Sequence, residues 1–263
     1  MTEAQAGHNV FQSQTTIARD GGRFVINGVK SVTSGVELAD RVVVFGRSPD
    51  TGGRAGFTAV LVDPAAPGIE RTELPMRYRE GTRQYQLAFS NVEAPLDGLI
   101  GAEGQALRVL WPFTHVERLL SAALCVGSAR YCISRARDHA ASRTVFGQQP
   151  IGADQAIQHP LAALHASTEA TRLLVYRAAA RFDAGADTQK IVADANMAKL
   201  LAADVLFGAA DHAMQTFGAR AWDEREGLID LFLDARAARS APVSQELALN
   251  YLAQHVLGLP SHR

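Results

Sequence analysis

The sequence predicts an α+β fold, in which an antiparallel β-barrel-like domain is followed by a C-terminal up-and-down helical bundle. Before about residue 104, short β-branched and aromatic stretches alternate with glycine, proline and aspartate. After it, long alanine-rich and leucine-rich stretches follow, with few interruptions. The 263 residues are enough for two ordinary domains. We therefore expect a β-domain over residues 1–103 and a helical domain over residues 104–263.

The β-domain is expected to contain a hairpin near its start. Residues 24–26 and 29–33 have strand character, and Asn27-Gly28 between them is typical of a two-residue type I′ turn. Other strands are expected where apolar runs lie between turn residues, at residues 42–45, 57–62 and 86–89. Together these segments predict an antiparallel sheet.

The helical domain is expected to contain five helices, placed by apolar periodicity and by the residues that interrupt it. They are predicted at residues 106–142, 153–184, 188–216, 224–239 and 244–257. The interruptions lie at residues 147–152, Gly185, Gly218 and Pro242. Cys125 and Cys132 would lie about 10 Å apart along the first helix, too far for a disulfide, so both are expected in the core.

Charge and hydropathy exclude several classes of partner. Twenty-six basic and twenty-seven acidic residues leave a balanced surface, with no electrostatic attraction to nucleic acid or anionic lipid. No apolar run approaches the roughly 18 residues that span a bilayer, and residues 1–5 do not resemble a secretory signal. We expect a soluble, cytoplasmic protein that binds neither nucleic acid nor a membrane.

Common catalytic signatures are missing from the sequence. It has no Gly-x-Gly-x-x-Gly, phosphate loop, His-Glu-x-x-His or Gly-x-Ser-x-Gly. Its eight histidines are scattered, and those on alanine-rich helices are typical of core or surface positions. We assign no metal site.

Two segments of the β-domain resemble the acyl-CoA dehydrogenase family. Residues 1–9 (MTEAQAGHN) are similar to that family's Thr-Glu-Pro-x-Ala-Gly-Ser-Asp, and residues 27–34 (NGVKSVTS) to its Asn-Gly-x-Lys-x-Trp-Ile-Thr. The resemblance implies FAD as the cofactor, with Thr2 hydrogen-bonded to the flavin ring and Ser34 near its reactive edge. It also places His8 at an acyl-CoA contact. Ala4, His8, Asn9 and Val32 depart from the family pattern at these contacts.

The resemblance continues through the helical domain. Residues 143–147 (RTVFG) are similar to Arg-x-x-Phe-Gly, residues 215–219 (QTFGA) to Gln-x-Phe-Gly-Gly, and residues 233–236 (LDAR) to the segment that follows in the family. By this match the adenine dinucleotide half of FAD would be bound by Arg143, Phe146, Asp154, Gln155, Gln215, Gly218 and Ala219. In the family these contacts cross subunits, which implies a homo-oligomer, either a dimer or a tetramer. Without the resemblance, Arg143 could be a surface helix end and Gly218 a helix C-cap.

The reaction of the family needs a base that removes the α-proton of the acyl thioester. Most members carry this glutamate near the C-terminus, where this chain has Pro242. The isovaleryl-CoA and long-chain branch carries it on the first long helix as Glu-Arg-Leu, which 117–119 resembles. The resemblance therefore implies Glu117 as the base and Arg118 as a substrate contact. The alternative is that Glu117 lies near a helix N-terminus and pairs with a neighbouring arginine.

The resemblance begins within the middle domain of the family, without the N-terminal helical domain. We favour an internal methionine of a longer enzyme as the explanation; the missing domain on another chain, or a reduced paralogue, are alternatives. Electron-transferring flavoprotein is the implied electron acceptor. A non-catalytic subunit of a hetero-oligomeric dehydrogenase and a flavin oxidase or monooxygenase on the same fold are the alternative functions.

Overall fold

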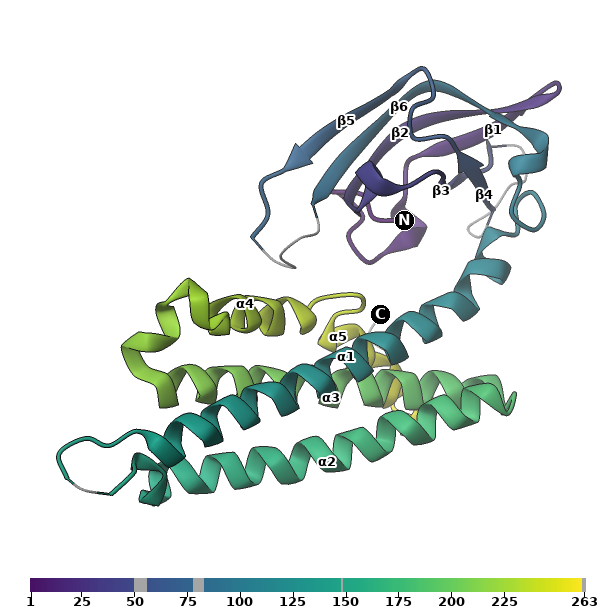
Figure 1. The fold of residues 1–263 in the computed structure, drawn as a ribbon. Helices are drawn as coiled ribbons and strands as arrows, with labels where there is room; N and C mark the ends of the chain where they lie inside the picture. The colour runs from purple at the N-terminus through teal and green to yellow at the C-terminus, as the bar shows by residue number, and fades with distance from the viewer. Residues whose placement is uncertain (50–55, 78–82, 148, 262–263) are drawn as a thin grey trace. The chain divides into compact units, whose positions relative to one another are not determined.

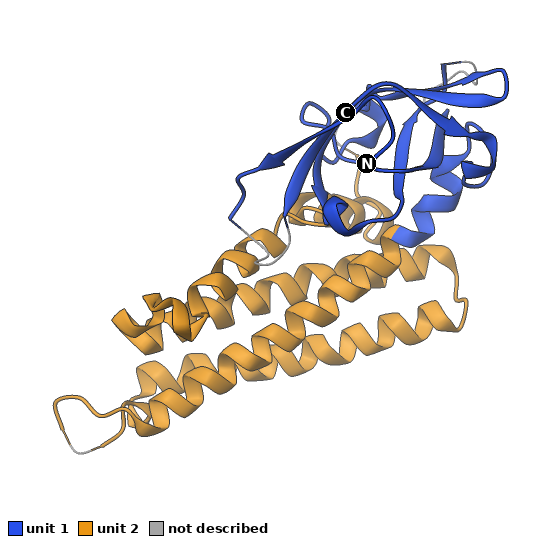
Figure 2. Ribbon diagram, turned by 45° about the horizontal axis from the view of Figure 1, so that its top comes forward, with its two compact units in different colours: residues 1–113 blue, residues 114–263 orange. Residues whose placement is uncertain are grey.

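The computed structural model describes residues 1–49, 56–77, 83–147 and 149–261. The chain folds as two compact units, residues 1–113 and residues 114–263, which Figure 2 shows in different colours. Strands make up the first unit and helices the second (Figure 1), which confirms the predicted α+β class.

The first unit contains a six-stranded sheet with the strand order β4-β3-β1-β2-β6-β5. The strands are β1 (Thr16–Asp20), β2 (Arg23–Ser34), β3 (Val42–Arg47), β4 (Phe57–Val62), β5 (Ile69–Leu74) and β6 (Gln84–Pro95). Neighbouring strands are antiparallel except β1 and β3, which pair in parallel where Thr16 faces Arg47. The sheet is therefore mixed. Phe24, Ile26, Val44 and Val60 contribute to its core, each at most 2% exposed.

The hairpin predicted around Asn27-Gly28 was wrong. These two residues lie inside β2, and the real hairpin turns at Gly21-Gly22, between β1 and β2. Gly28 has a φ of 142° at a register shift against β6. A Cβ there would lie 2.6 Å from the Cα of Thr15. Glycine is needed at this position because the backbone of Thr15 approaches closely and because the strand is irregular there. In sequence, a glycine retained for these two reasons looks the same as a glycine retained for a turn.

The helices of the second unit agree with the predicted segments, except near the C-terminus. They are α1 (Ala106–Ser142), which begins in the first unit, α2 (Gln155–Asp183), α3 (Thr188–Phe217), α4 (Leu228–Ala238) and α5 (Gln245–Tyr251). The fourth predicted helix is shortened because Glu224–Glu226 forms a separate 3-10 turn that ends at Gly227 in the left-handed region. The fifth continues from Tyr251 into a π-helical turn, Leu252–Val256.

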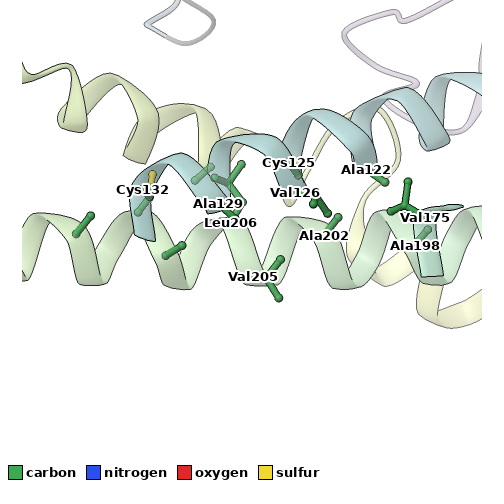
Figure 3. Close-up of a cluster of buried hydrophobic side chains, with 14 of the residues drawn as sticks. Ala122, Cys125, Val126, Ala129, Cys132, Val175, Ala198, Ala202, Val205 and Leu206 are labelled. Carbon is green, nitrogen blue, oxygen red and sulfur yellow. The ribbon is translucent and has the colours of Figure 1, made fainter. Parts of the chain in front are cut away.

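Small side chains of α1 and α3 share the core of the helical unit. Ala122 and Ala129 of α1 and Ala198 and Ala202 of α3 are fully buried in one cluster (Figure 3). Cys125 and Cys132 belong to the same buried cluster, as predicted, and are not disulfide-bonded. No described helix is both long and apolar enough to cross a membrane.

A buried carboxylate joins α2 to α3. Asp194 of α3 is 2% exposed and accepts hydrogen bonds from Arg177 (3.0 Å) and Arg181 (2.6 Å) of α2. Two arginines on one buried acid compensate its loss of hydration, so this ion pair fixes the register of the two helices.

Candidate functional site

In the β unit, Thr2 is held beside the strand that ends at Ser34. The backbone N–H of Ser31 donates to the carbonyl of Thr2 at 2.9 Å. Residues 4–8 then form a turn, in which the N–H groups of Ala6 and Gly7 both donate to the carbonyl of Glu3. Thr2 is half-buried, and His8 is exposed on this turn. The structure thus brings Thr2 onto β2, three residues before Ser34.

Ser34 ends β2 with a defined orientation. Its hydroxyl donates to Oε1 of the buried Gln84 at 2.8 Å. Two residues earlier, Val32 has a φ of 54°, a costly conformation for a β-branched residue, at a register shift between β2 and β6. This strain, which lies between Ser31, the partner of Thr2, and Ser34, could not be predicted from the residue types alone.

In the helical unit, Glu117 lies in the interior of α1. It stands about three turns after Ala106, the first residue of the helix, so the helix N-terminus does not account for an acid at this position. Its side chain is exposed and makes no hydrogen bond or ion pair with any other residue that the structure describes. The alternative that explained Glu117 by a helix terminus does not fit this arrangement, whereas the charge of Glu117 does act on the neighbouring Arg118.

The side chain of Arg118 is held by other residues of α1. Its Nη1 lies 3.1 Å from Nδ1 of His115 and 3.2 Å from the hydroxyl of Thr114. Because arginine only donates, Nδ1 of His115 must accept, and His115 is the neutral tautomer with its proton on Nε2. Burial, with the charge of Arg118, lowers the pKa of His115, and burial also lowers the pKa of Arg118. Nε of Arg118 is buried and has no partner among the described residues.

Lys199 was missed by the sequence analysis. It lies on α3, is 1% exposed, and its Nζ donates to the carbonyl of Val243 in the loop between α4 and α5. This is the loop in which Pro242 occupies the place of the glutamate expected in most relatives. Burial lowers the pKa of Lys199 to about 8. A lysine within the alanine-rich and leucine-rich part of the helix was the signal for it.

The two dinucleotide motifs of the helical unit meet at one end of the helices. His139, one turn before Arg143, stacks on Phe217 beside Gly218, with ring centroids 4.1 Å apart. Nε2 of His212 lies 3.4 Å from the carbonyl of Ile157, which brings the start of α2 to the same place. Figure 1 shows the ends of α1 and α3 beside the start of α2. Burial, with the charges of Arg220 and Arg143, lowers the pKa of His139.

The side chains of Arg143 and Phe146 are exposed at this end of the helical unit, although the backbone of Arg143 is bonded to His139 and Ile151. Arg143 follows the last residue of α1, is exposed, and forms no ion pair with a described residue. Phe146 is fully exposed and has a φ of 51°. An exposed aromatic ring on a strained backbone and an unpaired guanidinium together suit a ligand with planar rings and a pyrophosphate. These residues therefore fit the FAD expected from the sequence.

The other predicted dinucleotide contacts also have local backbone roles. Asp154 is the N-cap of α2 and accepts from the N–H of Ala156 at 2.8 Å. Gly218 is the C-cap of α3 with a φ of 60°, which favours glycine. Gln155, Gln215 and Ala219 are exposed, beside these caps.

The predicted residues fall into two groups, each described within its own unit. Thr2, His8 and Ser34 belong to the β unit, whereas Glu117, Arg118 and the dinucleotide motifs belong to the helical unit. Among the described residues, no group of three histidine, cysteine, aspartate or glutamate side chains could hold a metal ion.

Comparisons with known proteins agree with both units. A family model described as the acyl-CoA dehydrogenase middle domain matches residues 1–92, and one described as the acyl-CoA dehydrogenase C-terminal domain matches residues 107–257. Acyl-CoA dehydrogenase FadE12 of Mycobacterium tuberculosis is 38% identical over 261 residues, which cover 99% of this chain and 67% of the relative.

Solved structures show the same similarity. The complex of glutaryl-coenzyme A dehydrogenase with glutaryl-CoA superposes with a TM-score of 0.92 at 27% identity, over 100% of this chain and 68% of the other. The FAD complex of PigA superposes with a TM-score of 0.90 at 26% identity, over 98% of this chain and 66% of the other. The chain thus spans about two thirds of the length of these proteins.

Proposed function

Since the chain belongs to the acyl-CoA dehydrogenase family, whose cofactor is FAD, we propose that it oxidises the α,β-bond of an acyl-CoA thioester with Glu117 as the base. The carboxylate of Glu117 takes the α-proton as the hydride leaves the β-carbon. Bound FAD supplies the acceptor for that hydride. One proton and one hydride are removed together, which leaves an enoyl-CoA.

The observation that carries this proposal is the free carboxylate of Glu117. An acid inside a helix often forms an ion pair or a hydrogen bond with a neighbouring side chain. The charge of Glu117 acts on Arg118, but its carboxylate forms no hydrogen bond or ion pair with a described residue, and it lies far from a cap position. A catalytic base must leave its carboxylate free for the substrate.

The neighbouring residues support binding and orientation. Arg118 offers a buried Nε–H with no described partner, and His115 holds its guanidinium from the other side. We assign Arg118 and His8 to the acyl-CoA, Thr2 and Ser34 to the flavin ring, and Arg143, Phe146, Gln155 and Gln215 to the dinucleotide half of FAD. Asp154, Gly218 and Ala219 would shape the backbone beside it. Exposure of the dinucleotide residues supports a second copy of the chain, or a related chain, that shares this site. Electron-transferring flavoprotein is the proposed acceptor of the electrons.

The proposal is tested by anaerobic titration of the FAD-loaded protein with a panel of acyl-CoA thioesters. We expect at least one thioester to bleach the flavin absorbance, and Glu117→Gln to abolish bleaching while FAD remains bound. Glu70→Gln is the matched control, because Glu70 is an exposed glutamate on β5 with no described partner.

Each outcome has a distinct meaning. Bleaching of Glu117→Gln at the wild-type rate would show that another group is the base. Wild-type protein that binds FAD but is bleached by no thioester would contradict the dehydrogenase activity and support a non-catalytic subunit. Steady oxygen consumption during turnover would instead identify an oxidase.

A further inference from the structure

The β unit buries a pair of opposite charges that the proposed chemistry does not use. Glu3 is 1% exposed and Lys30 is 4% exposed, and Nζ of Lys30 lies 2.6 Å from Oε1 of Glu3. Removing two charges from water costs several kcal/mol for each ion unless hydrogen bonds compensate. A pair of this kind is retained only where its surroundings satisfy it.

Here every donor of the ammonium group has an acceptor. Besides Glu3, Nζ of Lys30 donates to the hydroxyl of Ser13 at 3.0 Å and to the carbonyl of Met1 at 3.4 Å. These three bonds equal the number of protons on a charged lysine. Lys30 can therefore stay charged in the core of the unit, although burial lowers its pKa.

The carboxylate of Glu3 gathers donors from separate segments. Its Oε2 accepts from Nε2 of Gln5 and from the N–H of Gln14, both at 2.7 Å. Its Oε1 also accepts from the N–H of Thr15 at 3.1 Å and from the hydroxyl of Ser13. Burial acts to raise the pKa of Glu3, but these bonds and that from Lys30 hold it well below its usual range. The network thus ties together residues 1–5, residues 13–15 and β2.

The two segments of the β unit that are assigned to the flavin, around Thr2 and around Ser34, are both attached to this network. Thr2 precedes Glu3, and its carbonyl accepts from Ser31, the residue after Lys30. The ion pair and this backbone bond therefore hold residues 2–3 against residues 30–31 at two adjacent points. From there the chain runs through Val32 to Ser34 on one side and into the turn of His8 on the other.

We propose that Glu3 and Lys30 are positioning residues for FAD, which fix Thr2 and the end of β2 at the spacing that the flavin ring requires. The inference rests on the proposed function. Neither charged group touches the flavin in this account; each acts through Thr2 and the backbone of residues 31–34. Because hydrogen bonds weaken steeply with distance and angle, a small displacement of Thr2 would change both the affinity for FAD and the electronic state of the ring.

The test uses variants that differ in how much of the network they remove. Glu3→Gln/Lys30→Met removes both charges together, so neither is left buried alone. Ser13→Ala keeps both charges and removes only the hydroxyl that bridges them, and this milder variant keeps the test decisive if the double variant does not fold. Glu93→Gln is the control, since it breaks an exposed ion pair with Arg23 in the same unit.

Two measurements are made on each variant. Titration with FAD gives the Kd and the visible spectrum of the bound flavin, and reductive titration of the complex gives its midpoint potential. Amide hydrogen exchange of the FAD-free protein reports the order of residues 4–9 against that of β4. We expect the double variant to bind FAD about tenfold more weakly, with a shifted flavin spectrum and potential, and to exchange residues 4–9 faster while β4 is unchanged. Ser13→Ala is expected to show the same changes to a smaller degree, and Glu93→Gln none.

The inference is overturned if the folded variants bind FAD with the wild-type Kd, spectrum and potential, or if exchange of residues 4–9 does not change. A pair that only stabilises the fold would lower stability without altering the bound flavin. Failure of the proposed function is distinguished by the wild type and Glu93→Gln: both would then bind FAD without being bleached by any thioester, while the Kd, the flavin spectrum and the exchange of the other variants still test the inference.

Discussion

Lys199 gives the helical unit a measurable dependence of stability on pH. Its ammonium group is buried against the carbonyl of Val243. Burial lowers its pKa to about 8 from 10.5; Arg118 adds to the lowering, while Cys125, Asp204 and Glu246 oppose it. We expect Lys199→Met to remove this dependence.

The sign and the size of this change in the free energy of unfolding follow from proton linkage. Between about pH 8 and 10.5 the unfolded chain binds a proton on Lys199 and the folded chain does not, so this residue makes stability rise with pH. Each pKa unit is worth about 1.4 kcal/mol, and integration from about pH 7 to about pH 10 gives roughly 2.5 kcal/mol. Below pH 8 the lysine stays charged in both states, and its burial is a constant penalty.

Urea unfolding of the FAD-free protein, followed by far-UV circular dichroism, measures the effect. The wild-type curve alone is not diagnostic, because burial also raises the pKa of Cys132 to about 11, which lowers stability as pH rises above about 9. The difference between wild type and Lys199→Met cancels that contribution. The variant also leaves the carbonyl of Val243 without its donor, at a cost of about 1–3 kcal/mol that does not depend on pH.

The expected result is a difference in free energy of unfolding that shifts by about 2.5 kcal/mol in favour of the wild type between about pH 7 and about pH 10. A difference that stays constant over this range would refute the reasoning, because it would mean that Lys199 titrates alike in the folded and unfolded chain. A shift of the opposite sign would mean that the bond to Val243 stabilises the charged form more than burial destabilises it.

Two other substitutions test the packing of each unit by the same unfolding measurement. Gly28→Ala places a Cβ 2.6 Å from Thr15 at a φ of 142°, so it should destabilise the β unit by about 3 kcal/mol or more, whereas Gly22→Ala, with nothing within 4 Å, should be nearly neutral. Asp194→Asn should cost the helical unit about 2 kcal/mol, because it removes the charge that two arginines bind, and Asp211→Asn at an exposed site of α3 is its control. Equal effects within either pair of variants would contradict these assignments.

The long helices could be predicted because their signals are local. The alanine-rich and leucine-rich periodicity gave α1 its observed bounds, and α2 and α3 begin after Asp154 and Asp187, whose side chains accept from the first N–H groups of each helix. The strand β5 was missed because it is an edge strand whose residues 70–73 are all exposed, so it has no apolar alternation to detect.

The polar networks could not be predicted because their partners are far apart in sequence. Lys199 and Val243 are separated by 44 residues, and Lys30 and Glu3 by 27. Nothing in the local sequence around each of these residues indicates burial or a partner, and only the fold brings the two partners together. The dinucleotide motifs were visible because each is a contiguous stretch, although the meeting of their ends at His139 and Phe217 required the packing of α1 on α3.

The structure also shows which of the motif residues support a bound ligand and which are explained by the fold alone. Asp154 and Gly218 would be selected by any helix that begins or ends at these positions, since one caps α2 and the other needs a positive φ. No helix cap or turn among the described residues explains phenylalanine at position 146. Its ring is fully exposed, and its backbone lies in a region that phenylalanine rarely adopts. Both features cost free energy in the chain by itself, and a ring system bound against Phe146 would offset them. The proposal of a dinucleotide site therefore rests on Phe146 and on Arg143, which forms no ion pair with a described residue, more than on the rest of the matching sequence.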